Sequence, residues 1–228
     1  MMKKLITTTL LSLSLVVSLY ADMEDNPLLY KITLDTVEMQ YGDEDVFSWD
    51  TNAWIGYDLN KIYIYSEGEK PEDGLSESEN QLLFSHTIAP YWDIQYGIGY
   101  DKADDAHQTW AVLALQGLAP YFFETRAAFL VGEDGNLGLR FSTEYEALLT
   151  QRLILTPSFE TELYTKDTPK IEIGKGLANI TAGLRLRYEV VREFAPYIGV
   201  EWSKNFGNTD NFHSLDETYL TAGFRIWF

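Results

Sequence analysis

The chain has 228 residues, no cysteine and 35 acidic against 17 basic side chains, which gives a formal net charge of −18. This charge argues against a nucleic-acid partner, and the lack of cysteine excludes disulfides and thiolate metal sites within these residues. Aromatic residues are frequent, with 15 Tyr, 12 Phe and 6 Trp. Such a composition suits a barrel with an apolar outer face and a charged interior.

Residues 1–21 are expected to be a secretory signal peptide. Lys3 and Lys4 precede an apolar and hydroxylated run over 5–17, and Ala21 provides a small residue before the acidic Asp22. The run is shorter than the ~20 apolar residues that a membrane-spanning helix needs. Removing the two lysines of this segment lowers the formal charge from −18 to about −20. Residues 22–27 are then expected to form a short N-terminal segment on the periplasmic side, and 28–228 to form the barrel.

Residues 28–228 show alternating apolar and polar side chains in short runs, which predicts β-strands. We expect twelve strands, at 28–41, 47–58, 61–69, 78–88, 91–101, 109–118, 121–132, 137–148, 153–165, 179–191, 195–205 and 217–228.

The connections between these strands alternate between long and short. The long ones are polar or acidic loops, at 42–45, 70–77, 102–108, 133–136, 166–178 and 206–216. The short ones are tight turns, several of them flanked by aromatic residues. An even strand count, strands of about ten residues and this asymmetry predict an up-and-down outer-membrane β-barrel, with long loops outside and short turns in the periplasm. A soluble sandwich also has many short strands but has no reason to sort its loops by length.

Charged residues recur on only one face of the predicted strands. In 179–191, for example, Arg185, Arg187 and Glu189 alternate with Leu184, Leu186 and Tyr188. The lipid face cannot accept such charges cheaply, so we assign them to the lumen. The predicted lumen charges are Glu67, Asp93, Glu124, Arg126, Arg140, Glu144, Glu146, Glu160, Glu162, Arg185, Arg187, Glu189, Glu201 and Arg225. Most are expected to form salt bridges that fill the interior, while the acidic excess favours cations.

The last strand ends on Phe228, an aromatic terminus that is typical of outer-membrane barrels and serves their assembly. Its alternation places Leu220, Ala222 and Phe224 on one face and Arg225 on the other. We expect this strand to pair with the first one and so close the barrel.

Five separated stretches resemble the copper resistance protein B family of Gram-negative outer membranes. They are WIGYDLNKIYIYSEGE (54–69), IAPYWDIQYGIGYD (88–101), QGLAPYFFETRAAFLVGEDG (116–135), YEALLTQRLIL (145–155) and REFAPYIGVEW (192–202). The resemblance covers nearly all of the chain after residue 27. It implies an outer-membrane protein of copper detoxification that binds copper, passes it across the outer membrane, and acts beside a periplasmic multicopper oxidase.

One feature of that family is reduced here. Its members often carry a long Met- and His-rich segment before the barrel, whereas residues 22–27 hold only Met23 as a soft ligand. Any copper site must therefore be built mainly by the barrel.

The candidate metal ligands are Met39, His107, His213 and Met23. Met39 is expected near the outer end of the first strand, and both histidines in outer loops. Because the last and first strands pair, we hypothesise that Met39 and His213, with a carboxylate such as Asp43 or Asp210, form a low-affinity copper site at the outer mouth. The alternative is that these loop histidines are simply solvated. His86 is expected on the lipid side, near the periplasmic end.

Two other functions remain open. The barrel alone would equally suit a cation-preferring porin without copper selectivity. Some twelve-stranded barrels are lipid hydrolases, but the adjacent Ser85 and His86 point to opposite faces of a strand and cannot form a nucleophile–base pair. No catalytic activity is expected.

Overall fold

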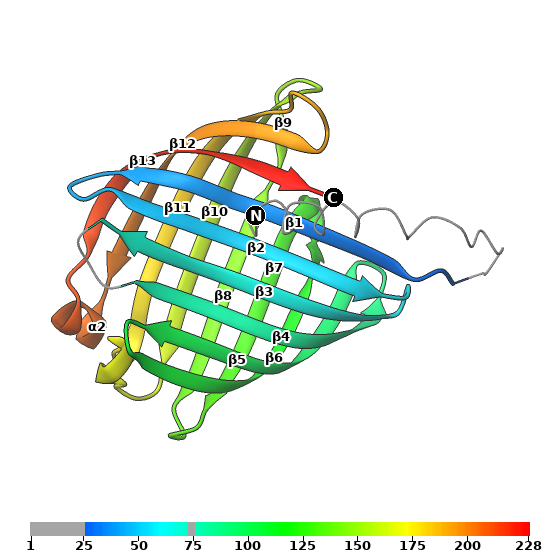
Figure 1. The fold of residues 1–228 in the computed structure, drawn as a ribbon. Helices are drawn as coiled ribbons and strands as arrows, with labels where there is room; N and C mark the ends of the chain where they lie inside the picture. Colours follow the sequence, from blue (N-terminus) through cyan, green and yellow to red (C-terminus); the bar gives the residue numbers. More distant parts are fainter. Residues whose placement is uncertain (1–25, 73–75) are drawn as a thin grey trace, which may run out of the picture.

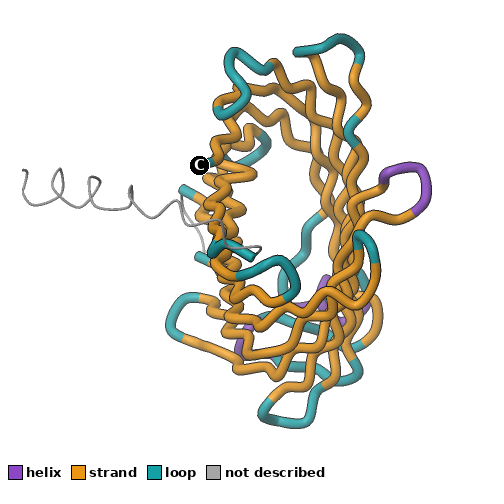
Figure 2. The backbone as a smooth tube through the Cα atoms, turned by 90° about the vertical axis from the view of Figure 1, so that its right-hand side faces the viewer, coloured by secondary structure: helices purple, strands orange, loops and turns teal. Residues whose placement is uncertain are grey.

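A computed structural model of the protein describes residues 26–72 and 76–228, which form one closed antiparallel sheet (Figures 1 and 2). The predicted signal peptide, Met23 and most of the short N-terminal segment lie outside the described residues. Each strand pairs with its neighbour in sequence, and β13 pairs with β1 to complete the ring. Figure 2 shows that the ring is flattened rather than round.

The elements follow the chain without a crossover. They are β1 (Leu29–Tyr41), β2 (Val46–Gly56), β3 (Asn60–Pro71), β4 (Glu77–Ala89), β5 (Trp92–Ala103), β6 (Ala106–Ala119), η1 (Pro120–Phe122), β7 (Phe123–Gly132), β8 (Leu137–Tyr145), β9 (Ala147–Leu148), β10 (Leu153–Tyr164), η2 (Pro169–Ile171), β11 (Gly176–Tyr188), β12 (Phe194–Asn205), α2 (Gly207–Phe212) and β13 (Asp216–Trp227).

The barrel has the twelve strands that the sequence predicts. β8 and β9 both pair with β10 and are separated only by Glu146, so they are two parts of one wall strand. The fold class is therefore confirmed as a closed twelve-stranded antiparallel barrel. Closure is completed by Phe228, whose backbone N–H donates to the Ile32 carbonyl at 2.8 Å while its own carbonyl accepts from Ile32 at 3.0 Å.

The two ends of the barrel differ. The loop end carries the connections 42–45, 104–105, 133–136, 165–175 and 206–215, and there β3 ends and β4 begins. The turn end carries the other five connections, and Figure 1 shows α2 at the loop end, away from the C-terminus. In barrels of this kind the loop end faces the outside and the turn end faces the periplasm. Within residues 26–72 and 76–228, no helix is long and apolar enough to cross a membrane.

The predicted loop 102–108 is wrong, because the strands on both sides run almost to their junction. Lys102 pairs with His107 and Ala103 with Ala106, which leaves a two-residue turn of Asp104 and Asp105. Asp104 adopts a left-handed conformation with φ of 52°, which suits a tight hairpin. His107 consequently lies in β6 and not in a loop.

β1 contains a register irregularity between Leu34 and Val37, seen against both neighbouring strands. A bulge inserts one extra residue and reverses the faces of every side chain beyond it. Glu38 and Gln40 are therefore buried inside the barrel, whereas Met39, opposite Phe47 and Ala222, faces outward.

The interior is packed with apolar side chains over β4 to β7. Leu83, Trp110, Val112, Ala128 and Leu130 form one buried cluster there. Their sequence neighbours, such as Leu82, Leu113 and Phe129, are exposed on the outer face. The outer face is thus apolar, as a lipid-facing wall requires.

Candidate functional site

Arg140 of β8 is the centre of the largest ion-pair cluster in the lumen. Its guanidinium contacts Asp101 Oδ2 at 2.6 Å and Glu162 Oε1 at 3.3 Å, and it also pairs with Glu79. Its Nε donates to the Tyr164 hydroxyl at 2.9 Å. Only 9% of the Arg140 side chain is exposed. A cation this buried requires its carboxylates, so the cluster fixes β4, β5, β8 and β10 relative to one another.

A second cluster joins β1, β11 and β12. Arg185 contacts Glu38 Oε1 and Glu201 Oε2, both at 2.7 Å, and the Gln40 amide bridges the same two carboxylates at 3.2 and 3.0 Å. Glu38 is fully buried here because of the bulge in β1.

Two more arginines share Glu146, the residue between β8 and β9. Arg187 contacts its Oε1 at 2.6 Å, and Arg225 contacts the same atom at 2.9 Å and Asp35 at 2.9 Å. The break in the wall strand lets this carboxylate reach both cations. Nearer the turn end, Lys61 lies 3.5 Å from Asp93, whose carboxylate also accepts from Ser85 and Thr87.

Arg126 is the exception among the lumen arginines. Its guanidinium donates to Gln81 at 2.5 Å and lies over the Tyr65 ring at 4.9 Å. Within residues 26–72 and 76–228, no carboxylate lies within ion-pair distance of it.

A row of carboxylates crosses four neighbouring strands, β2 to β5. Asp50 is the register partner of Glu67, Glu67 of Glu79, and Glu79 of Asp101. Directly opposed residues of like charge repel one another, so this row needs cations nearby. Arg140 neutralises the Glu79 and Asp101 end, but Asp50 and Glu67 make no ion pair among the described residues.

Other inward carboxylates also lack a cation in the part of the chain that the structure describes. They are Glu69, Glu77, Glu124, Glu144 and Glu160. Glu69 opposes Glu77 and Glu124 opposes Glu144, so these too are like-charge pairs. Glu67, Glu69, Glu124 and Glu160 are all solvent-exposed although they point to the inside. Water therefore reaches the lumen, and it meets an excess of negative charge.

The structure places the predicted lumen charges on two kinds of site. Arg140, Arg185, Arg187 and Arg225 lie in ion-pair clusters, whereas Glu67, Glu124, Glu144 and Glu160 do not. Glu189 lies just beyond the end of β11, in the turn and not on the strand. Sequence reasoning missed Glu38, Glu79 and Asp101, because the bulge and the strongly polar loop ends of β4 and β5 hide the alternation.

The candidate metal ligands have different surroundings. His107 faces outward with its ring stacked on Tyr100, with ring centroids 5.4 Å apart. His213 Nδ1 lies 3.3 Å from Glu172 Oε2, and the neighbouring Ser214 hydroxyl donates to Asp210. Met39 lines an outward hollow of about 620 Å³ with Asp45, Phe47 and Lys70. Among the described residues, no group of three or more His, Cys, Asp or Glu side chains is arranged to hold a metal ion.

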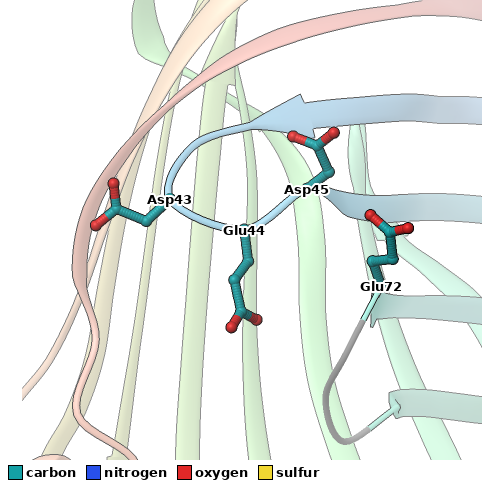
Figure 3. Close-up of a pocket in the computed structure, with 4 residues that line it drawn as sticks. All are labelled: Asp43, Glu44, Asp45 and Glu72. Carbon is teal, nitrogen blue, oxygen red and sulfur yellow. The ribbon is translucent and has the colours of Figure 1, made fainter.

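A second hollow, of about 330 Å³, lies at the loop between β1 and β2 and is lined by Asp43, Glu44, Asp45 and Glu72. Figure 3 shows that these four carboxylates point in different directions and do not converge on one point. They add negative charge at the mouth, but they do not form a coordination site. Ser85 and His86 do point to opposite faces: Ser85 contacts Asp93 in the lumen and His86 Nδ1 lies 2.8 Å from Asn60 Oδ1.

Two solved structures with the same fold are porins. The KdgM porin superposes with a TM-score of 0.52 at 12% identity, covering 86% of this chain and 98% of its own. The NanC porin superposes with a TM-score of 0.56 at 10% identity, covering 87% of this chain and 99% of its own. These likenesses concern the fold alone. The closed antiparallel barrel with its apolar outer face places the protein in the outer membrane.

Proteins related in sequence identify the family to which the chain belongs. Copper resistance protein B of Escherichia coli is 41% identical over 212 residues, which cover 90% of this chain and 72% of the relative. A copper resistance protein B homolog of Pseudomonas syringae pv. tomato is 35% identical over 212 residues, which again cover 90% of this chain and 72% of the relative. The profile of the copper resistance protein B precursor family matches residues 28–228. The resemblance expected from five sequence stretches is thus confirmed, and the chain belongs to the copper resistance protein B family.

Proposed function

We propose that the barrel binds copper ions weakly and passes them across the outer membrane through its acid-lined lumen. The observation that carries this proposal is the set of inward carboxylates without a cation, above all Asp50, Glu67 and Glu160, two of which are solvent-exposed. Rings of carboxylates favour cations, and passage requires contacts that are weak enough to release the ion.

The ligand chemistry favours Cu(II) over Cu(I) as the permeating ion. Cu(II) accepts carboxylate and imidazole ligands, whereas Cu(I) prefers thiolate and thioether. The chain has no cysteine and four methionines, and Met39 faces away from the lumen. Carboxylates are the abundant ligands along the path.

The negative charge of the lumen favours a different class of cargo from the one found in a structural neighbour. A KdgM porin structure contains oligogalacturonate, a polyanionic sugar chain. An acidic lumen repels such a ligand and concentrates cations instead. The same architecture therefore supports the opposite class of cargo here.

A weak copper site at the loop-end mouth remains part of this proposal. His213, with Glu172 beside it, is the main candidate ligand, and Met39, on the outer face of β1, would be a separate one. Replacing both His213 and Met39 with Ala should lower copper binding by the refolded barrel, measured by titration calorimetry. If copper binding were unchanged, the mouth site would be ruled out and the lumen carboxylates would be the remaining candidate ligands.

A cation-preferring porin without copper selectivity is the second candidate function. It is favoured by the finding that the described residues contain no preformed group of metal ligands. By family, a periplasmic multicopper oxidase is the proposed partner that receives the copper, and the barrel itself is proposed to have no catalytic role.

Metal uptake into proteoliposomes tests the proposal. Copper should enter faster than zinc and magnesium, and Glu67→Gln with Glu160→Gln should slow copper uptake. Glu193→Gln is the matched control, because it removes the same charge from the turn between β11 and β12. Equal permeation by all three metals would support the porin without copper selectivity.

A further inference from the structure

We propose that the loop 165–175 is the constriction of the loop-end mouth and that Ile171 anchors it inside the barrel. This inference rests on the proposed passage through the lumen, but it concerns the size of the path and not its charge. The loop connects β10 and β11 and contains η2.

Ile171 lies within the interior cluster of the barrel. It is only 6% exposed and belongs to the same buried group as Ala103, Trp110 and Tyr164. Trp110 points inward, because its Nε1 donates to Asp101 at 2.6 Å in the Arg140 cluster. By contrast, Tyr100 on the outer face of β5 is 43% exposed. The tip of the loop therefore folds through the mouth and packs on the inner side of β5 and β6.

The first residues of the loop are fixed by Asn136 from the turn between β7 and β8. This side chain is fully buried, and its amide donates to the Lys166 carbonyl and to Thr168 Oγ1, each at 3.0 Å. Its Oδ1 accepts from the Lys166 backbone N–H at 2.9 Å. Thr168 and Ile173 then close the tip by backbone hydrogen bonds in both directions. The inward position is thus specified by hydrogen bonds as well as by apolar packing.

The loop 206–215 braces the constriction from the other side. Thr209 Oγ1 accepts from the Gly174 N–H at 2.9 Å, and a Cβ at Gly174 would lie 2.1 Å from the Thr209 nitrogen. Asn208 donates to Asp167 Oδ1 at 3.0 Å, and this bond, with another from the Lys175 N–H, keeps the pKa of the Asp167 carboxyl below its usual value. The His213–Glu172 contact joins the same two loops.

This arrangement narrows the mouth on the side of β5 and β6. The inward carboxylates at the loop ends of the adjoining strands β3 and β4 are Glu69 and Glu77, and Glu77 is the register partner of Ala103 in the cluster that holds Ile171. Because Glu69 and Glu77 lie nearer the loop end than Glu67 and its partner Asp50, an entering ion meets them first. The loop sets how wide the path is, and the carboxylates set which charge it admits.

Single-channel conductance of the refolded barrel in potassium chloride tests the proposal. Ile171→Ala should raise the conductance severalfold, because the loop loses its anchor, while the zero-current potential in a salt gradient stays cation-selective. Lys170→Ala is the matched control: this neighbouring side chain is exposed and pairs with the exposed Glu133 in the turn between β7 and β8. It should leave the conductance unchanged.

A tether gives a second measurement that does not depend on the anchor. Asp167→Cys with Asn208→Cys introduces the only two thiols in the chain, so a short thiol-reactive cross-linker can join only these loops. Added to Ile171→Ala, the cross-link should return the conductance to the wild-type value, because it holds the loop in the mouth.

Two outcomes would overturn the proposal. One is an unchanged conductance in a folded Ile171→Ala barrel, and the other is a raised conductance that the cross-link fails to reduce. If Glu67→Gln still alters ion selectivity in either case, the proposed function stands and only the constriction is lost.

Discussion

The lumen has two regions that treat charge in opposite ways. Around Arg140, Arg185 and Glu146, every buried charge has an ion-pair partner. Along β2, β3 and β10, the carboxylates of Asp50, Glu67 and Glu160 have none among the described residues, and they oppose or neighbour like charges. The first region holds the strands together and the second is available to a mobile cation. Stability and selectivity should therefore respond to different substitutions.

The largest effect should come from removing the cation of the paired region. Arg140→Leu leaves Glu79, Asp101 and Glu162 without their shared partner, so the free energy of unfolding should fall by about 3–5 kcal/mol. Urea unfolding followed by tryptophan fluorescence measures this. Arg152→Ala, an exposed arginine in a turn, is the control and should change the stability little. A loss as small as that of the control would mean that the cluster is not structural.

Neutralising carboxylates of the unpaired region should raise the stability of the barrel instead of lowering it. Asp50→Asn with Glu67→Gln removes a directly opposed like-charge pair, so stability should rise by up to about 1 kcal/mol. Cation selectivity, measured by the zero-current potential in a salt gradient, should fall at the same time. If stability fell instead, these carboxylates would have cation partners and the two regions would not differ.

A smaller change should convert part of the unpaired region into a paired one. Ser142 is the register partner of Glu160, so Ser142→Lys places an ammonium group beside that carboxylate. We expect a gain in stability of roughly 0.2–1 kcal/mol and a modest loss of cation selectivity. Ser142→Gln, which adds bulk without charge, separates the electrostatic effect from narrowing of the lumen. Equal selectivity losses in both variants would assign the effect to size.

Much of the architecture could be predicted from the sequence, because a lipid-facing wall imposes a strict alternation on each strand. The strand count, the closure by the last strand and the inward position of Arg140 and Arg185 follow from that alternation. Met39 shows where prediction from alternation ends. A single extra residue in β1 reverses the faces of the side chains after the bulge, and nothing in the local sequence pattern marks that bulge. The prediction of a loop at 102–108 was wrong for a related reason, because polar residues can continue a strand beyond the membrane.

The partners of the lumen charges could not be predicted at all. Arg140 meets Glu79 from a strand 61 residues away, and Arg225 meets Glu146 across 79 residues. Such pairs depend on the flattening of the barrel and on how long side chains cross it. The inward fold of Ile171 is similar, because a loop sequence does not show whether its apolar residues face water or the interior.

The unpaired carboxylates are proposed to make the lumen a path for copper cations. The most direct measurement is the zero-current potential across a planar bilayer with a copper(II) salt gradient, for the wild-type barrel and for Asp50→Asn with Glu67→Gln and Glu160→Gln. We predict a potential of the sign set by copper permeation in the wild type, which shifts towards zero in the triple variant. A potential of the opposite sign, or one that the triple variant leaves unchanged, would contradict the claim.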